Sequence, residues 1–210
     1  MAMSSWGSNR SYSSERKIVA HSIGINPDQL AFARQTHSDR IQYVVSSGLA
    51  GECDSLITNH RSVILSIMVA DCIPIFLYAP DSDAIGLVHV GWKGTANGVV
   101  VKTVKGMVRN FGSRPELIEV FMGPSIRPCC YEVQKDVASL FSDKFLESKR
   151  TNCFYLDLQK ANCHQLRSCL IKAENIKADD RCTFCDSEGF HSYRREGHRA
   201  SRMLCLISLT

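Results

Sequence analysis

Two short, strongly aliphatic runs constrain the fold of this chain most. Residues 63–69 read VILSIMV and residues 84–88 read AIGLV. Both runs are short and rich in aliphatic side chains, which predicts buried strands and not helices. Cys72 follows closely on the first run, and His89 follows directly on the second. Because strands can present such side chains together at the rim of a sheet, we expect Cys72 and His89 to be neighbours in space.

A third apolar run, residues 30–36, leads into His37. Zinc accepts two imidazoles and one thiolate as ligands, and three protein ligands leave the fourth tetrahedral position for water or substrate. The sequence therefore predicts a catalytic zinc site made by His37, Cys72 and His89. Asp71 fits two roles beside this site: a catalytic group that orients a histidine or moves a proton, or a cap at the end of the strand.

The rest of the chain mixes strand and helix patterns without a regular βαβ rhythm. Turn residues at 80–83 predict a hairpin between two of the strands, and Gly112 is expected to end a helix. We expect one domain over residues 1–210, with an α+β fold of mixed-sheet α/β layers in which helices flank a central mixed β-sheet. The expected strands are 30–36, 41–46, 55–58, 63–69, 73–78, 84–90 and 117–122, and the expected helices are 14–23, 99–111, 133–145 and 158–173.

Composition narrows the class of protein. The formal charge of +4 comes without a run of five or six like charges, so we expect no nucleic-acid partner, and an anionic small substrate is compatible with this charge. The most apolar stretch, residues 63–79, contains Asp71 and Pro74, which argues against a membrane span. The polar start, residues 1–14, lacks a signal core, so the ten cysteines are expected to be reduced in a cytoplasmic protein.

Further cysteines and cations lie outside the predicted zinc site. Cys182 and Cys185 have the spacing of half a zinc ribbon, but no second tightly spaced pair completes it, and Cys129 adjoins Cys130. We expect packing or site-wall roles for these four. The basic segment Tyr193, Arg194 and Arg195 fits either a solvated turn or an anion clamp, and Arg34, Lys93 and Arg127 are further candidates for binding substrate.

Five ordered segments stand out along the chain: QTH at 35–37, ADCIP at 70–74, HVGWKG at 89–94, GPSIRPCCYEV at 123–133 and SYRR at 192–195. Together they resemble one family, the bacterial multicopper polyphenol oxidases that carry a laccase domain. The resemblance implies a zinc site from His37, Cys72 and His89. It also implies purine nucleoside phosphorylase activity on a purine nucleoside and phosphate, with adenosine deaminase and methylthioadenosine phosphorylase as side activities.

The chain departs from the family pattern at its start and at Lys93. Residues 1–13 are too short for the extra strand and Gly-Gly loop that members usually carry, and Lys93 stands where arginine is usual, so it would bind phosphate as a point charge. Laccase chemistry needs a histidine-rich copper cluster, commonly filled by His-x-His pairs. This chain has seven histidines and no such pair. Copper in the same His/Cys site, with weak phenol oxidation, is one alternative.

Two further readings stay open from the residues alone. Cys72, activated by His89, could act as the nucleophile of a thiol hydrolase. The family resemblance is compatible with this reading, since some members are described as editing peptidoglycan precursors. A zinc ion that only braces a binding module would need a closed fourth position, which Cys53, Cys129 or Cys130 could fill.

Overall fold

A computed structural model describes residues 18, 20–22, 24–150 and 153–210. The helix expected over residues 14–23 falls mostly outside them. The strands are β1 (Leu30–Arg34), β2 (Ile41–Tyr43), β3 (Gly48–Glu52), β4 (Ser55–Thr58), β5 (Ile64–Val69), β6 (Ile73–Ala79), β7 (Ala84–Val90), β8 (Glu119–Met122), β9 (Glu132–Val133), β10 (Leu146–Arg150), β11 (Cys153–Leu156), β12 (Ile176–Ala178) and β13 (Met203–Ile207). The α-helices are α2 (Trp92–Ala96), α3 (Val99–Phe111), α4 (Lys135–Ala138), α5 (Leu158–Ser168) and α6 (Tyr193–Glu196), and 3₁₀ turns are η1 (Pro27–Gln29), η2 (Pro115–Leu117), η3 (Asp143–Phe145), η4 (Ala173–Asn175) and η5 (Gly197–Arg199).

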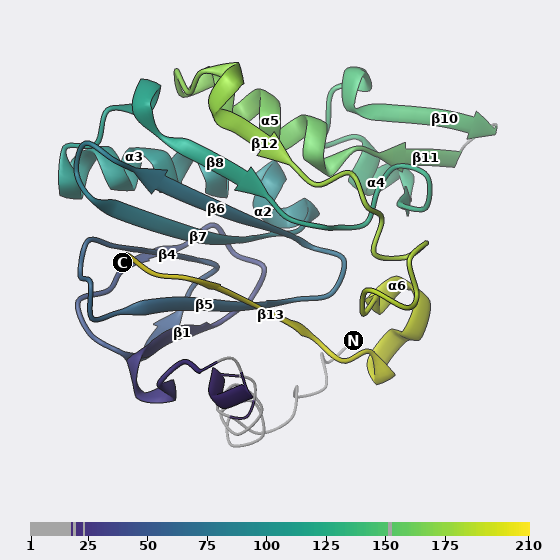
Figure 1. Ribbon diagram of the computed structural model, residues 1–210. Coiled ribbons are helices and arrows are strands. Elements are labelled where there is room, and N and C mark those ends of the chain that lie inside the picture. Colours follow the sequence, from purple (N-terminus) through teal and green to yellow (C-terminus); the bar gives the residue numbers. More distant parts are fainter. Residues whose placement is uncertain (1–17, 19, 23, 151–152) are drawn as a thin grey trace.

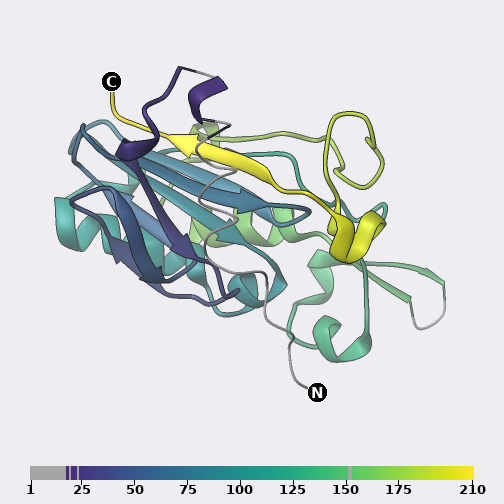
Figure 2. The same cartoon turned by 90° about the horizontal axis from the view of Figure 1, so that it is seen from below.

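The architecture is layered. A six-stranded mixed sheet has the order β12-β8-β6-β7-β4-β2, and a four-stranded mixed sheet has the order β13-β5-β1-β3 (Figure 1). Helices α3 and α5 cover one face of the six-stranded sheet, and the four-stranded sheet packs against the other. A small third sheet, β10-β11-β9, lies at one end of the molecule, and α6 lies beside the start of β13 (Figure 2). This arrangement confirms the expected fold class of mixed sheets flanked by helices.

Strand β7 lies between the two layers of core. All seven of its residues are buried. Because side chains alternate along a strand, Val88 and Val90 pack with α3 while Ile85 and Leu87 pack with β5. Such two-sided burial explains why this run contains no polar residue until His89 at its end.

The core between the two sheets gives a first testable prediction. Leu87 is 0% exposed, and Leu87→Ala is expected to lower the free energy of unfolding by about 2–5 kcal/mol, since it removes buried methyl groups and leaves a cavity. Chemical denaturation measures this loss. Leu49→Ala, at a side chain that is 53% exposed on β3, is the matched control and should cost less than about 1 kcal/mol. Equal losses in the two variants would contradict the packing described.

Several elements confirm the sequence analysis. Strands β6 and β7 form the expected antiparallel hairpin, closed where Ala79 pairs with Ala84 across the turn at residues 80–83. Helix α3 spans the expected residues and ends at Gly112, whose φ of 70° is the left-handed conformation that glycine adopts easily. Strand β4 also has the expected bounds.

The helix expected over residues 133–145 is wrong. Val133 instead pairs with Phe154 in the third sheet, and the segment then forms only the short α4 and the 3₁₀ turn η3. The helical spacing arose because Val137, Phe141 and Phe145 all pack on the core, which an irregular chain can also achieve. The expected helix 158–173 is shortened to α5, after which Leu170 takes a φ of 71°. Among the described residues, none of the helices has the length and apolar character needed to cross a bilayer.

Candidate functional site

The three predicted metal ligands meet at one place in the structure. His37 follows β1, Cys72 lies in the turn between β5 and β6, and His89 lies near the end of β7. Their donor atoms all lie within 4.8 Å of one another, and Cys72 Sγ is 3.8 Å from His37 Nε2. Bond lengths to zinc of about 2.3 Å for sulfur and 2.0–2.1 Å for nitrogen imply a separation of about 3.6 Å, so the geometry fits one ion.

The site is open on one side. His89 is only 5% exposed, Cys72 is half-buried and His37 is exposed. The two imidazole rings meet edge to face, with centroids 4.8 Å apart. A donor set with one buried and one exposed histidine leaves room for a small molecule to approach from the His37 side.

Backbone strain concentrates in the two turns that carry the site. His37 has a φ of 55° and Asp71, next to Cys72, has a φ of 81°. Residues other than glycine rarely occupy this region, and they do so mainly where surrounding contacts hold them for function. Both turns are thus shaped to present a donor atom rather than to connect strands by the easiest path.

The buried carboxylate of Asp54 holds both histidines in place. Its Oδ1 accepts hydrogen bonds from His89 Nδ1 at 2.8 Å and from the backbone of His37 at 3.0 Å. Its Oδ2 accepts from the backbones of Thr36 and Ser38 and from the Ser38 hydroxyl, at 3.2, 2.6 and 2.7 Å. A carboxylate on Nδ1 leaves Nε2 of His89 directed at the metal position, as in many zinc sites. The sequence analysis missed Asp54, because the partners of its carboxylate all lie 16 or more residues away and no apolar run leads into it.

Electrostatics favour the metal-binding form of the cysteine. Burial raises the pKa of the Cys72 thiol, but the charge of His89 and hydrogen bonds from both histidines outweigh burial and lower the pKa to about 6. Burial opposes charge on His89, yet Cys72 and Asp54 raise its pKa to about 9. Burial likewise raises the pKa of Asp54, and the contact with His89 lowers it to about 2. The thiolate, which is the ligand and the nucleophile, is therefore accessible at neutral pH.

Gly91 permits the close approach of the ligands. A Cβ atom at this position would lie 3.0 Å from Cys72 Sγ and 3.3 Å from His37 Cδ2. Gly91→Ala is therefore expected to displace one ligand and to weaken metal affinity by about 10–100-fold, as loss of a supporting contact does at other metal sites. Metal titration of the purified variant measures this. Gly106→Ala in α3 is the control, since its Cβ would meet Ile57 at an ordinary 3.4 Å, and equal weakening there would contradict the steric argument.

The hydrogen bonds of Asp71 among the described residues go to groups other than histidines. Its carboxylate accepts hydrogen bonds from Thr183 Oγ1 at 2.7 Å and from the Arg194 backbone at 2.6 Å, and its carbonyl accepts from Ile126 at 3.0 Å. The expected role of orienting a histidine is filled by Asp54 instead. Asp71 joins the Cys72 turn to two loops and to α6, which explains why it is buried.

The two arginines of the expected anion clamp both donate hydrogen bonds to backbone carbonyls of neighbouring segments. Arg195 donates from Nη1 to the carbonyls of Thr183 and Phe184, and from Nη2 to Phe190 and Glu196. Arg194 donates to the carbonyl of Glu132 and lies over the ring of Tyr131. These contacts hold the loop around α6, and Arg194 is exposed while Arg195 is half-buried. Binding of substrate by the two guanidinium groups stays a prediction.

The other expected substrate contacts lie in different environments. Arg34 is exposed and pairs with Glu52 at 3.5 Å, and the Lys93 ammonium lies 5.4 Å from the centre of the Trp92 ring. Tyr193 is 38% exposed and packs edge to face on His198.

Two polar groups near the Asp71 loop are buried without a partner. Arg127 Nη1 and Ser125 Oγ have no hydrogen-bond partner among the described residues. Burial and the nearby Cys72 thiolate raise the pKa of Tyr131 above its usual range, which places this phenol close to the site. Tyr131 was not singled out from the sequence. Arg127 and Ser125 adjoin Ile126, whose backbone donates to the Asp71 carbonyl, so these groups belong to the loop that contacts the Cys72 turn.

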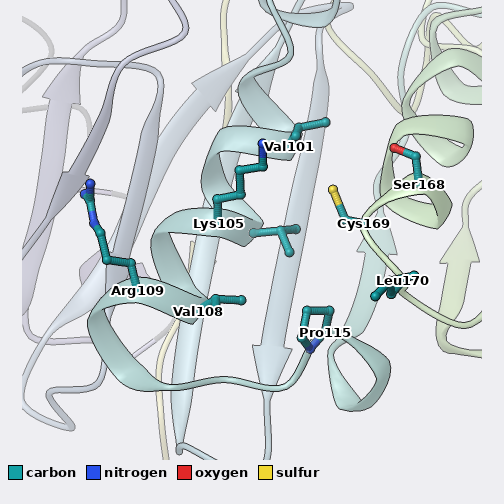
Figure 3. A pocket seen from close by; sticks show the side chains of 9 residues that line it. Val101, Lys105, Val108, Arg109, Pro115, Ser168, Cys169 and Leu170 are labelled. Atoms are coloured by element: carbon teal, nitrogen blue, oxygen red, sulfur yellow. The ribbon is translucent and has the colours of Figure 1, made fainter.

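A cavity of about 460 Å³ lies elsewhere, between α3 and the segment that follows α5 (Figure 3). Its lining is mostly apolar, with Val101, Val108 and Leu170 turned toward it. None of the lining residues belongs to the His37, Cys72 and His89 site. The donor atoms, and not the size of this cavity, therefore locate the candidate active site.

The fold and the site together define a class: layered α/β proteins that present two histidines and one cysteine at the end of a mixed sheet. Residues 3–210 match the family described as multi-copper polyphenol oxidoreductase laccase, and the chain belongs to this family. This confirms the resemblance drawn from the sequence.

Relatives similar to this chain include a purine nucleoside phosphorylase and an adenosine deaminase. A purine nucleoside phosphorylase of Clostridium acetobutylicum is 35% identical over 191 residues, which cover 87% of this chain and 78% of that protein. An adenosine deaminase of an unknown prokaryotic organism is 29% identical over 205 residues, covering 89% of this chain and 78% of that one. The solved structure of YlmD from Geobacillus stearothermophilus superposes with a TM-score of 0.90 at 28% identity, covering 100% of this chain and 84% of that one.

Proposed function

We propose that this protein, as one domain, is a purine nucleoside phosphorylase that depends on a metal held by His37, Cys72 and His89. The observation that carries the proposal is the meeting of these three donor atoms within 4.8 Å at the ends of neighbouring strands. Relatives named purine nucleoside phosphorylase at 35% identity support the reaction class.

Zinc fits this donor set best. Two imidazoles and one thiolate with an open fourth position are typical of catalytic zinc, and Asp54 supplies the outer carboxylate that such sites use. Among the described residues, the group of His37, Cys72 and His89 contains two histidines, and the other group of possible metal ligands contains four cysteines and no histidine. Neither group matches the histidine-rich donors of a laccase. Copper loaded into the same three ligands remains the alternative metal, with weak phenol oxidation as its expected consequence.

The residues of the chain divide the work of phosphorolysis. Phosphate attacks C1′ of the ribose as the bond to the purine nitrogen breaks, giving the free base and ribose 1-phosphate. Zinc supplies Lewis acidity at such a site and makes water a better nucleophile at neutral pH. Arg127, with its unpartnered Nη1, and Lys93 are the cations we assign to phosphate, and Tyr131 is the ring we assign to the purine. Asp71 acts as a positioning residue through Thr183 and Arg194.

Adenosine deamination is proposed as a side activity of the same centre. Water adds at C6 of adenine and ammonia leaves, so no phosphate is consumed. The relative named adenosine deaminase supports this reaction, and phosphorolysis of methylthioadenosine is the third activity that we propose. We also propose a cytoplasmic location, because the ten cysteines, all in the described part of the chain, form no disulfide.

Product analysis tests the proposal directly. Zinc-loaded protein is incubated with adenosine, with and without phosphate, and the products are identified by mass spectrometry. Adenine and ribose 1-phosphate that form only with phosphate support phosphorolysis, and inosine in both reactions supports deamination. Untouched adenosine would overturn the proposal.

A thiol hydrolase is the second candidate, since the low pKa of Cys72 beside two histidines also suits a nucleophile. Activity on a peptidoglycan precursor that survives chelation and is lost on alkylation of Cys72 would favour it. The proposed phosphorylase instead loses activity on chelation and regains it with zinc.

A further inference from the structure

A second cluster of metal-binding side chains lies outside the site described above. Cys129 and Cys130 lie in the loop between β8 and β9, and Cys182 and Cys185 lie in the loop after β12. The four sulfur atoms lie within 4.8 Å of one another. The sequence analysis assigned these residues to packing or to the site wall, because it could not see that the folded chain joins the two pairs.

The sulfur positions fit one tetrahedral ion. Cys129 Sγ and Cys130 Sγ lie 3.8 and 3.3 Å from Cys185 Sγ. A zinc–sulfur bond of about 2.3 Å implies sulfur–sulfur edges of about 3.8 Å in a tetrahedron. A disulfide would need about 2.05 Å, and the structure forms none among the ten cysteines, all of which it describes.

The backbone holds the two loops together independently of the sulfur atoms. Ser125 and Cys182 form a parallel β-bridge, and the Thr183 backbone donates to the Ser125 carbonyl at 3.1 Å. The backbone N–H groups of Arg127, Phe184 and Cys185 also donate to the Cys182 sulfur. Such donors stabilise negative charge on a thiolate ligand and orient it toward a metal. The cluster is thus prepared for a cation by contacts that do not themselves require one.

We propose that Cys129, Cys130, Cys182 and Cys185 bind one structural zinc ion. Four protein ligands close the coordination sphere, which is the arrangement of structural and not catalytic zinc. The ion braces the wall of the candidate active site, because the same two loops reach Asp71 through Thr183 Oγ1 at 2.7 Å and the Ile126 backbone at 3.0 Å. Asp71 adjoins Cys72, so the second ion would stabilise the turn that carries the first site.

Metal analysis of the Cys72→Ala protein isolates the second site. With the first site disabled, the purified protein is expected to retain about one zinc ion per chain, and X-ray absorption should show sulfur ligands at about 2.3 Å. Cys185→Ser in the same background is expected to lose that ion and to lower Tm by more than about 5 °C. Cys163→Ser, at a half-buried cysteine of α5 outside both clusters, is the control and should keep the ion.

Three results would overturn the proposal. These are a Cys72→Ala protein without bound zinc, retained zinc with nitrogen or oxygen ligands, and a Cys130–Cys185 disulfide found by mass spectrometry in freshly purified protein. The first measurement needs only the intact cluster, so it stands even where Cys185→Ser fails to fold. No enzyme assay is involved, and failure of the proposed phosphorylase activity would leave this result unchanged.

Discussion

Replacing Cys72 by alanine is expected to abolish metal binding at the first site and to lower phosphorolysis of adenosine by more than about 100-fold. Loss of an outer-shell partner alone typically costs 10–100-fold, and this change removes one of three ligands. The fold should survive, because the Cys72 side chain is only half-buried at the rim of the sheet. The measurement is zinc content together with the rate of adenine release in the presence of phosphate.

Cys163→Ala is the matched control for Cys72→Ala. Cys163 is a half-buried cysteine on α5, away from both metal clusters, and the control should keep the rate and zinc content of the parent protein. A Cys72→Ala protein that releases adenine at the parent rate would show that the reaction does not pass through this site. Equal loss in both variants would point to a general effect of cysteine replacement.

Asp54→Asn is expected to reduce both stability and metal affinity. An amide keeps one oxygen but turns N–H groups toward the donors of His37, Ser38 or His89, so buried donors lose their acceptor. Each such loss costs about 1–3 kcal/mol, and we expect a total near 3 kcal/mol in the free energy of unfolding. Zinc affinity should fall by about 10–100-fold, since His89 loses the group that orients its ring. Chemical denaturation of the metal-free protein and zinc titration measure the two effects separately.

Asp39→Asn controls for the change of carboxylate to amide. Asp39 lies in the same loop as His37, but its carboxylate pairs at the surface with Lys102. Loss of this pair should cost no more than about 1 kcal/mol and leave zinc affinity unchanged. If Asp39→Asn matches Asp54→Asn in both measurements, the special role of Asp54 is contradicted.

The sequence led to the three candidate metal ligands, which the structure brings together, but not to the carboxylate that supports them. His37, Cys72 and His89 each follow an apolar run, and such a run predicts a strand from neighbouring residues alone. Asp54 follows no such pattern. Its carboxylate accepts five hydrogen bonds, four from residues 36–38, which lie 16 to 18 residues earlier, and one from His89, which lies 35 residues later. Only the pairing of β4 with β7 brings this carboxylate under the histidines.

The charged residues show the same division. Arg194 and Arg195 have the composition of an anion clamp, and composition alone does not reveal that backbone carbonyls surround the Arg195 guanidinium. Arg127 has no better motif, yet its Nη1 is one of the buried polar atoms that have no hydrogen-bond partner in the described part of the chain. A cationic side chain can bind a substrate only if the loops around it do not already supply carbonyl groups that accept its hydrogen bonds.

The sequence by itself determined the features that depend on neighbours along the chain. Turn residues at 80–83 specify the hairpin of β6 and β7, and apolar residues at helical spacing specify α3, which ends at Gly112. These signals depend only on residues that are close together along the chain. The tertiary structure decided the rest. Thr183 reaches Asp71 across 112 residues and Cys130 reaches Cys185 across 55, and such contacts form only when the whole core has packed and fixed both loops.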